Sequence, residues 1–99
     1  MSTTFSSTLE WAKTDLARYP QIVVPPPGPL SSDYHRRCTR YFKGLSGQVK
    51  LFPVAFESGA ACTLVDVDGN KYIDFSSGIY VTTLGHCHPK ISEAVARYA

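Results

Sequence analysis

The sequence predicts an α+β fold in which short helices accompany a small antiparallel sheet of three strands. Three short runs rich in apolar and β-branched residues indicate the strands, at residues 52–57, 62–67 and 71–75. The pair Asp68-Gly69 separates the second run from the third and favours a hairpin, because glycine adopts positive φ at little steric cost. Apolar residues repeat at helical intervals before and after these runs, and this periodicity predicts the helices.

The first helix and a proline-rich connector precede the predicted sheet. The helix is expected over residues 7–19, where Ser7 and Glu10 have the spacing of a capping box and Pro20 closes the segment. The connector at residues 23–29 is expected to be stiff and extended, since its prolines lack the amide hydrogen that a helix requires.

A second helix is expected between the connector and the sheet. Ser31 or Ser32 caps it, and it runs to about Lys43, where Gly44 supplies a stop. A loop at residues 45–50 then leads to the first strand.

The last helix is expected to begin at His88-Pro89, because proline fits the first helical position. It follows a loop of small and β-branched residues at 76–87. Its apolar stripe contains Ile91, Ala94, Val95 and Tyr98. This stripe and the second face of the sheet need more partner surface than 99 residues supply, so we interpret the chain as an incomplete unit.

Composition limits the class of protein. The chain has 99 residues, of which 43% are hydrophobic and 18% charged, as in one globular domain rather than a disordered chain. Its net charge of +2 is too small to indicate a polyanionic partner. Three cysteines without framework spacing favour reduced thiols and a cytoplasmic location. No apolar run approaches the ~18 residues of a membrane span, and we expect no secretory signal because the N-terminus lacks a basic region followed by an apolar one.

One stretch has the residue types of a calcium loop. It is Asp66-Val-Asp68-Gly69-Asn70, in which oxygen-bearing side chains alternate. The continuation does not fit, because Lys71 stands where the loop needs glycine and Ser77 where it needs glutamate. We therefore interpret the stretch as a hairpin turn.

A second group has donor atoms that suit zinc: His35, Cys38, His86, Cys87 and His88. Adjacent residues in an extended loop project in opposite directions, so His86, Cys87 and His88 offer at most two ligands on one side. No carboxylate at a telling spacing supports acid–base work by either of the two later histidines. Structural roles, in a bend and at the start of the last helix, explain them better.

Basic residues gather in the second helix and the loop after it: Arg36, Arg37, Arg40, Lys43 and Lys50. Interleaved aromatic residues could stack on bases, so a small nucleic-acid-binding module is an alternative. A charge run is usually a solvated helix face, and the whole chain is nearly charge-balanced. We therefore expect no nucleic-acid partner.

Four short motifs follow one another between residues 66 and 89. They are Asp66-Val-Asp-Gly69, Tyr72-Ile-Asp-Phe75, Gly78-Ile79 and Gly85-His86-Cys-His88-Pro89. In order and spacing they resemble the N-terminal region of class III pyridoxal-phosphate-dependent aminotransferases, the family of 4-aminobutyrate and acetylornithine aminotransferases. The resemblance is strongest at residues 51–98 and weaker through the connector and the second helix.

The resemblance implies a parent with the α/β architecture of the fold type I pyridoxal-phosphate-dependent transferases. In it, residues 1–50 would form a helical arm with the proline-rich connector, and residues 51–99 an incomplete part of the small domain. The implied enzyme is a homodimer with pyridoxal 5'-phosphate as cofactor. It would transfer an amino group from an ω-amine or amino acid, such as 4-aminobutyrate, to a 2-oxo acid.

The resemblance also implies a substrate-binding role for Ile79, with Tyr80 and Val81 beside the same pocket. A stiff apolar side chain on a glycine-flanked loop suits the wall of a pocket for an aliphatic amine. Tyr80 stands where the family often has a smaller residue, so it could narrow the pocket or hydrogen-bond a carboxylate.

No catalytic, cofactor-binding or metal-binding residue is implied in this chain. The family places the Schiff-base lysine, the acid opposite the pyridinium nitrogen and the phosphate cradle further downstream. We therefore expect the isolated 99-residue chain to be an inactive N-terminal fragment. A non-catalytic adaptor that pairs with a full-length enzyme is the remaining alternative.

Overall fold

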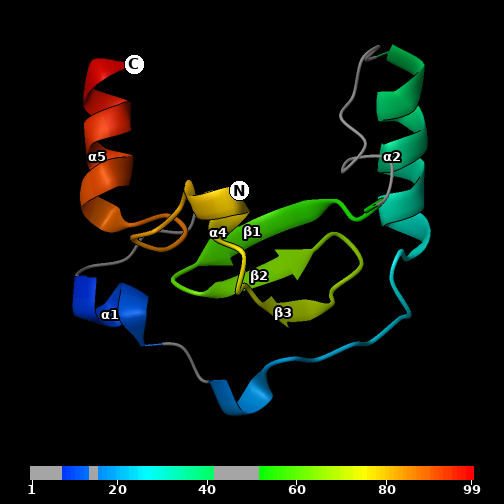
Figure 1. Ribbon diagram of the computed structural model, residues 1–99, viewed down its shortest axis with the longest axis horizontal. Helices are drawn as coiled ribbons and strands as arrows, with labels where there is room; N and C mark the ends of the chain where they lie inside the picture. Colours follow the sequence, from blue (N-terminus) through cyan, green and yellow to red (C-terminus); the bar gives the residue numbers. More distant parts are fainter. Residues whose placement is uncertain (1–7, 14–15, 42–51) are drawn as a thin grey trace.

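The computed structural model describes residues 8–13, 16–41 and 52–99. Figure 1 shows a central sheet with α2 at one end and α5 at the other, and with α1 near the base of α5. The helical segments are α1 (Thr8–Ala12), the 3₁₀ turn η1 (Leu16–Arg18), α2 (Pro29–Tyr41), α4 (Ser77–Tyr80) and α5 (Pro89–Tyr98). The strands are β1 (Phe56–Ala60), β2 (Thr63–Asp66) and β3 (Lys71–Ile73).

The predicted three-stranded antiparallel sheet is confirmed, with the strand order β1-β2-β3. Its predicted hairpin is confirmed as well, since the turn at Asp68-Gly69 joins β2 to β3 and Val65 pairs with Lys71. Gly69 has a φ of +89°, a conformation that glycine adopts without strain. The turn residues therefore act as the local pattern indicated.

The position of β1 differs from the prediction. Residues 52–57 were expected to form the strand and Ser58-Gly59 to end it, but β1 runs from Phe56 through both of these residues to Ala60. A Cβ atom at Gly59 would lie 2.9 Å from a methyl group of Leu64 and 3.1 Å from Cβ of His86. The missing side chain of Gly59 therefore lets Leu64 and His86 approach the strand closely, and this glycine does not form a turn.

The first helix is much shorter than the predicted segment of residues 7–19. α1 ends at Ala12, and η1 occupies Leu16–Arg18 just before Pro20. Short isolated helices are marginal in water, because nucleation costs more than a few hydrogen bonds return. The predicted cap at Ser7 lies outside the described residues.

α2 begins at Pro29, earlier than the predicted caps at Ser31 or Ser32. Proline fits the first position of a helix, and the next amide groups bond to the Asp68 side chain instead of a local serine. The helix is described to Tyr41. The predicted end near Lys43, the stop at Gly44 and the loop at 45–50 lie outside the described residues.

The interior of the described chain is mainly polar. Asp66 and Asn70 are fully buried, whereas Trp11, 7% exposed, is the one hydrophobic side chain buried among the described residues. The Asn70 side chain uses its whole amide. Its Oδ1 accepts the N–H groups of Val23 and Val24, and its Nδ2 donates to the carbonyl of Val24 and to Asp66 Oδ2. These bonds tie the connector to the hairpin.

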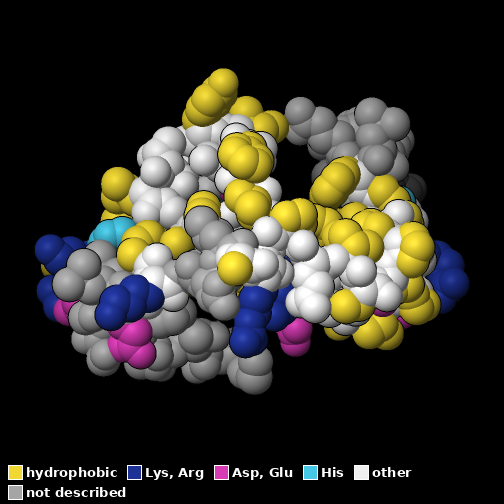
Figure 2. Space-filling model, turned by 90° about the horizontal axis from the view of Figure 1, so that it is seen from below, with side chains coloured by type: hydrophobic (Ala, Val, Ile, Leu, Met, Phe, Trp, Pro, Cys, Tyr) yellow, Lys and Arg dark blue, Asp and Glu magenta, His cyan; other side chains and the backbone are white. Residues whose placement is uncertain are grey.

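The predicted start of the last helix is confirmed, since α5 begins at Pro89 with His88 as its cap. Its predicted apolar stripe is exposed. Ile91, Val95 and Tyr98 are 52%, 61% and 83% exposed, respectively. Figure 2 shows hydrophobic side chains over much of another face of the molecule. Apolar area of this extent marks surface that stable proteins usually cover.

Candidate functional site

The segment from Asp74 to His86 forms a closed loop, which we call the 74–86 loop. Its ends meet through the side chains, with His86 Nε2 2.6 Å from Asp74 Oδ2. The backbone of His86 also exchanges two hydrogen bonds with Ala61, at 2.9 and 3.1 Å, beside the start of β2. Trp11 Nε1 donates to the carbonyl of His86 at 2.7 Å. The loop is therefore fixed to both the sheet and α1.

Asp74 holds the beginning of the loop as well as its end. Its Oδ1 accepts hydrogen bonds from Ser76 N, Ser76 Oγ and Ser77 N, between 2.8 and 3.1 Å. Burial raises the pKa of Asp74, but the hydrogen bonds from His86, Ser76 and Ser77 outweigh it and lower the pKa to about 2. Asp74 is therefore a carboxylate at any physiological pH.

The pairing of Asp74 with His86 corrects one interpretation of the sequence. In the sequence, no carboxylate at a telling spacing supports acid–base work by the histidines, but the structure places a carboxylate beside His86. The two residues lie 12 positions apart, and no short motif predicts such a pair. Asp74 and Trp11 are the loop-fixing residues that sequence reasoning missed.

Inside the loop, α4 has an unusual backbone. Ser77, Gly78, Ile79 and Tyr80 have φ values of +51°, +59°, +61° and +68°. Gly78 and Ile79 lie in the left-handed helical region, with ψ of 38° and 58°. This conformation costs about 1–2 kcal/mol for each residue that carries a Cβ atom. The surrounding structure must supply that free energy.

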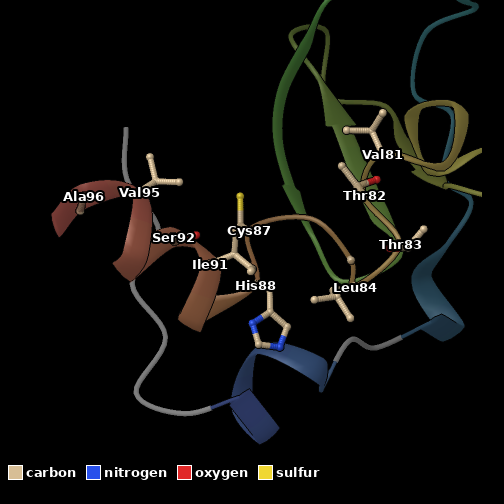
Figure 3. Close-up of a pocket in the computed structure, with 11 residues that line it drawn as sticks. Val81, Thr82, Thr83, Leu84, Cys87, His88, Ile91, Ser92, Val95 and Ala96 are labelled. Atoms are coloured by element: carbon tan, nitrogen blue, oxygen red, sulfur yellow. The ribbon is translucent and has the colours of Figure 1, made fainter. Parts of the chain in front are cut away.

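The three predicted substrate-binding residues lie in or next to α4. Ile79, Tyr80 and Val81 are 61%, 84% and 80% exposed. Val81 lines a groove of about 520 Å³ between the loop and α5, whereas Ile79 and Tyr80 do not line it. Figure 3 shows the apolar side chains of this groove, with those on α5 facing those on the loop. The substrate role of the three residues stays a prediction.

A second, smaller cavity of about 280 Å³ lies on the other side of the loop. Its lining includes Trp11, Cys62 and Asp74, and it shares Thr82 with the larger groove. Thr82 Oγ1 is buried without a hydrogen-bond partner within the described ranges. The loop thus separates two hollows and carries one unsatisfied polar atom between them.

His88 has the structural role that the sequence indicated. Its Nδ1 accepts the N–H group of Lys90 at 3.2 Å and so caps α5. Its ring packs edge-on against Trp11, with the ring centroids 4.9 Å apart, and Figure 3 shows it pointing toward α1. The bend before it needs Gly85, whose φ is +97° and whose missing Cβ leaves room for the Trp11 ring.

The two aspartates considered for a calcium site accept hydrogen bonds from backbone N–H groups. Asp66 Oδ1 accepts the N–H groups of Asp68 and Asn70, and the Asp68 carboxylate accepts those of Leu30 and Ser31. Residues 8–13, 16–41 and 52–99 contain no group of three or more His, Cys, Asp or Glu side chains that could hold a metal ion.

The basic face of α2 is partly neutralised. Arg36 and Arg37 both contact Asp33, and Arg37 also lies over the Tyr34 ring. Lys43 and Lys50 lie outside the described residues. In the part of the chain that the structure describes, no helix is long and apolar enough to span a membrane.

The sequence model of the family Aminotransferase class-III matches residues 45–99. The chain belongs to this family. The match contains the sheet, the whole 74–86 loop and α5.

Curated relatives agree with this assignment. The chain is 41% identical over 80 residues to an alanine/serine racemase of Pyrococcus horikoshii, a match that covers 81% of this chain and 17% of the relative. It is 52% identical over 46 residues to an acetylornithine aminotransferase of Nostoc sp., covering 46% of the chain and 11% of that protein. A glutamate-1-semialdehyde 2,1-aminomutase of Legionella pneumophila is 40% identical over 82 residues, which cover 83% of the chain and 17% of the aminomutase. The chain thus spans about a sixth or less of these relatives.

Class III aminotransferases use pyridoxal 5'-phosphate. The described residues of this family member do not fit that group by themselves. No lysine lines either cavity. Lys71 lies over the Tyr19 ring, with Nζ 5.7 Å from the ring centroid, and so is engaged elsewhere. Within the described residues, the 74–86 loop and the groove beside it are the features that could contribute to such a site.

Proposed function

We propose that this chain forms the N-terminal part of a pyridoxal-phosphate-dependent aminotransferase. The enzyme would transfer an amino group from an ω-amine or amino acid, such as 4-aminobutyrate, to a 2-oxo acid. Membership of the family supports the reaction class, and the names of the relatives include both aminotransferases and enzymes that move or invert amino groups within one substrate. We propose that the transfer takes place between two molecules rather than within one substrate, and that the donor is such an amine.

The observation that carries the proposal is the fixed but outward-facing backbone of α4. Ile79 and Tyr80 are presented to the exterior by a turn whose two ends are fastened through Asp74 and His86. An exposed apolar residue in a strained and fastened turn is typical of a functional site, because strain persists only where other contacts enforce it. A branched aliphatic side chain held in this way would wall a pocket for the carbon chain of an amine.

In this proposal the cofactor is held by residues outside the described part of the chain. The described part would bind and orient the amine and exclude water along one side, while the cofactor supplies the electron sink when it is bound. We accordingly propose that the 99-residue chain alone does not transaminate. The parent would be a homodimer, in which the exposed apolar face of α5 is covered by further protein. Three free and exposed cysteines support the further proposal of a reducing, cytoplasmic location.

The proposal is tested by amine kinetics in the full-length protein that contains this segment. Substituting Ile79→Ala should raise KM for 4-aminobutyrate or another preferred amine by about ten-fold, because it removes apolar contact in a substrate pocket. The control is Phe52→Ala, an exposed aromatic residue before β1. An unchanged KM in the Ile79 variant for every amine and amino acid tested would refute the substrate role.

A pairing function without catalysis is the second candidate. It is favoured by the exposed stripe of α5, in which Ile91 and Val95 line the apolar groove and Tyr98 is exposed. Co-purification with a complete class III enzyme would support it. A chain that co-purifies with none, but completes an active enzyme when joined to the missing residues, would exclude it.

A further inference from the structure

We propose that Asp74 and His86 are positioning residues that hold α4 in its left-handed turn and thereby place Ile79 and its neighbours toward substrate. The statement that these residues face substrate rests on the proposed function. The holding of the turn itself rests on the contacts of the 74–86 loop alone.

The first argument is that Asp74 acts at both ends of the strained turn. One carboxylate oxygen accepts the amide groups of Ser76 and Ser77, immediately before and at the start of α4. The other lies 2.6 Å from His86 Nε2, at the end of the loop. A single side chain therefore fixes the separation and the direction of the two ends of the loop.

The second argument is that His86 cannot shift with the loop. Both of its backbone groups pair with Ala61 at the sheet, and its carbonyl accepts a further bond from Trp11. Across this corner, Gly59 leaves space for His86 Cβ. Because His86 is fixed by its backbone, its side chain gives Asp74 a rigid partner.

The third argument concerns what α4 lacks. Its own backbone hydrogen bonds all end on two carbonyl groups: Ile79 N and Tyr80 N donate to that of Ser76 at 3.0 and 3.3 Å, and Val81 N and Thr82 N donate to that of Ser77 at 2.8 and 2.9 Å. Ile79 and Tyr80 are exposed, so burial of their side chains contributes little to holding the turn. Backbone bonds from Asp74 N to the Cys62 carbonyl and between His86 and Ala61 anchor the two ends of the loop to the sheet. The side chain of Asp74 adds hydrogen bonds to both ends, at Ser76 and Ser77 and at His86. A backbone in a sparsely populated region persists only when its surroundings enforce it.

The test is amide hydrogen exchange of the full chain, read residue by residue. In the wild type, the amide groups of Val81 and Thr82 should be protected. Asp74→Ala should accelerate their exchange by about ten-fold or more, since charged hydrogen bonds at both ends of the loop are lost. The amide groups of β2 and β3, such as that of Val65, should keep their protection. Asp33→Ala, which removes an exposed carboxylate from α2, is the matched control and should change neither set.

A conservative variant separates positioning from general destabilisation. His86→Gln keeps a side-chain N–H donor that can reach Asp74, so it should restore most of the protection that His86→Ala loses. If His86→Gln and His86→Ala accelerate exchange equally, the specific pair is not what holds the turn. Unprotected Val81 and Thr82 amides in the wild type would overturn the proposal without any variant. So would a loss of protection that spreads evenly over the sheet.

Kinetics of the full-length protein then test the link to substrate. Asp74→Asn should raise KM for the amine with little change in kcat, because a misplaced wall weakens binding of substrate and transition state alike. If Ile79→Ala raises KM and Asp74→Asn does not, the positioning role is overturned while the proposed function stands. If neither changes KM but exchange at α4 responds as expected, the proposed substrate role of the loop fails and its fastening by Asp74 stands.

Discussion

Gly28 and Asp68 lie so close together that a Cβ atom at residue 28 would stand 2.3 Å from Asp68 Cγ. The carboxylate fills this space because it accepts the N–H groups of Leu30 and Ser31, both at 2.9 Å. These groups belong to the first turn of α2, where they have no partner inside the helix, and a negative charge there is favourable. The hairpin turn between β2 and β3 thus determines where α2 begins.

This relationship predicts a cost for any side chain at residue 28. Gly28→Ala should destabilise the fold by about 1–3 kcal/mol, the range for overpacking a close contact. The Asp68 side chain could move away only by giving up its bonds to α2. Chemical denaturation measures the free energy of unfolding, and Asp68→Ala supplies the comparison, because it removes the atoms that a Cβ at residue 28 would meet. If Gly28→Ala costs as much in the Asp68→Ala background as in the wild type, contact with the Asp68 side chain does not set the cost.

Acid should loosen the start of α2. Burial raises the pKa of Asp68, but the N–H groups of Ser31 and Leu30 outweigh it and hold the pKa below the ordinary value of 3.8. The carboxylate therefore adds stability at every pH above about 3.8, and this contribution is lost as the pH falls through the lower folded value. Circular dichroism of helix content across pH 2 to 6 would measure the loss. In the Asp68→Asn variant the side chain at residue 68 cannot titrate. Its helix content should therefore lack the part of the acid transition that protonation of Asp68 causes.

The sequence predicted the elements whose signals are local. The Asp68-Gly69 turn and the proline at the start of α5 each specify a conformation through one or two residues, and both are present. The start of α2 was misplaced, because it depends on a carboxylate 38 residues away from Leu30. The shift of β1 likewise depends on the contact of Gly59 with His86, which no periodicity records.

The candidate site was predictable only in part. Ile79 and its neighbours were identified through the family motif, not from the conformation of the turn. Neither Ile79 nor Tyr80 is a residue type that favours positive φ, so composition gave no sign of the left-handed turn. Asp74 belongs to the family motif Tyr72-Ile-Asp-Phe75, but its pairing with His86 depends on how the loop closes in three dimensions. Long-range closure is the information that a single sequence lacks.

Tyr72 should titrate later than an ordinary tyrosine. Its hydroxyl donates to Asp66 Oδ2 at 2.7 Å, and burial together with this bond raises the pKa of Tyr72 to about 12. The protonated phenol therefore stabilises the fold below about pH 10, and this contribution is lost as the pH rises through 12. Tyrosinate absorbance should show one late group among the six tyrosines. Tyr72→Phe should remove that late step, and persistence of the step would assign it to another tyrosine.

Ile79 should be a residue whose replacement improves stability. Its left-handed conformation costs about 1–2 kcal/mol, and glycine would avoid that cost while losing about 0.5–1 kcal/mol through the greater freedom of the unfolded chain. Because Ile79 is 61% exposed, little burial is lost. Ile79→Gly should therefore raise the free energy of unfolding, by up to about 1.5 kcal/mol. Under the proposed function, the same change should weaken amine binding.

Val95 gives this last prediction a matched control. It is also β-branched and also 61% exposed, but it lies in the right-handed helix α5. Val95→Gly should lower the free energy of unfolding by roughly 0.5 kcal/mol, because glycine is a poorer helix former than valine. Opposite signs for the two glycine variants would follow from their opposite backbone conformations. If Ile79→Gly lowers the free energy of unfolding as Val95→Gly does, the turn is not strained. The argument that Asp74 and His86 hold a strained turn would then fail.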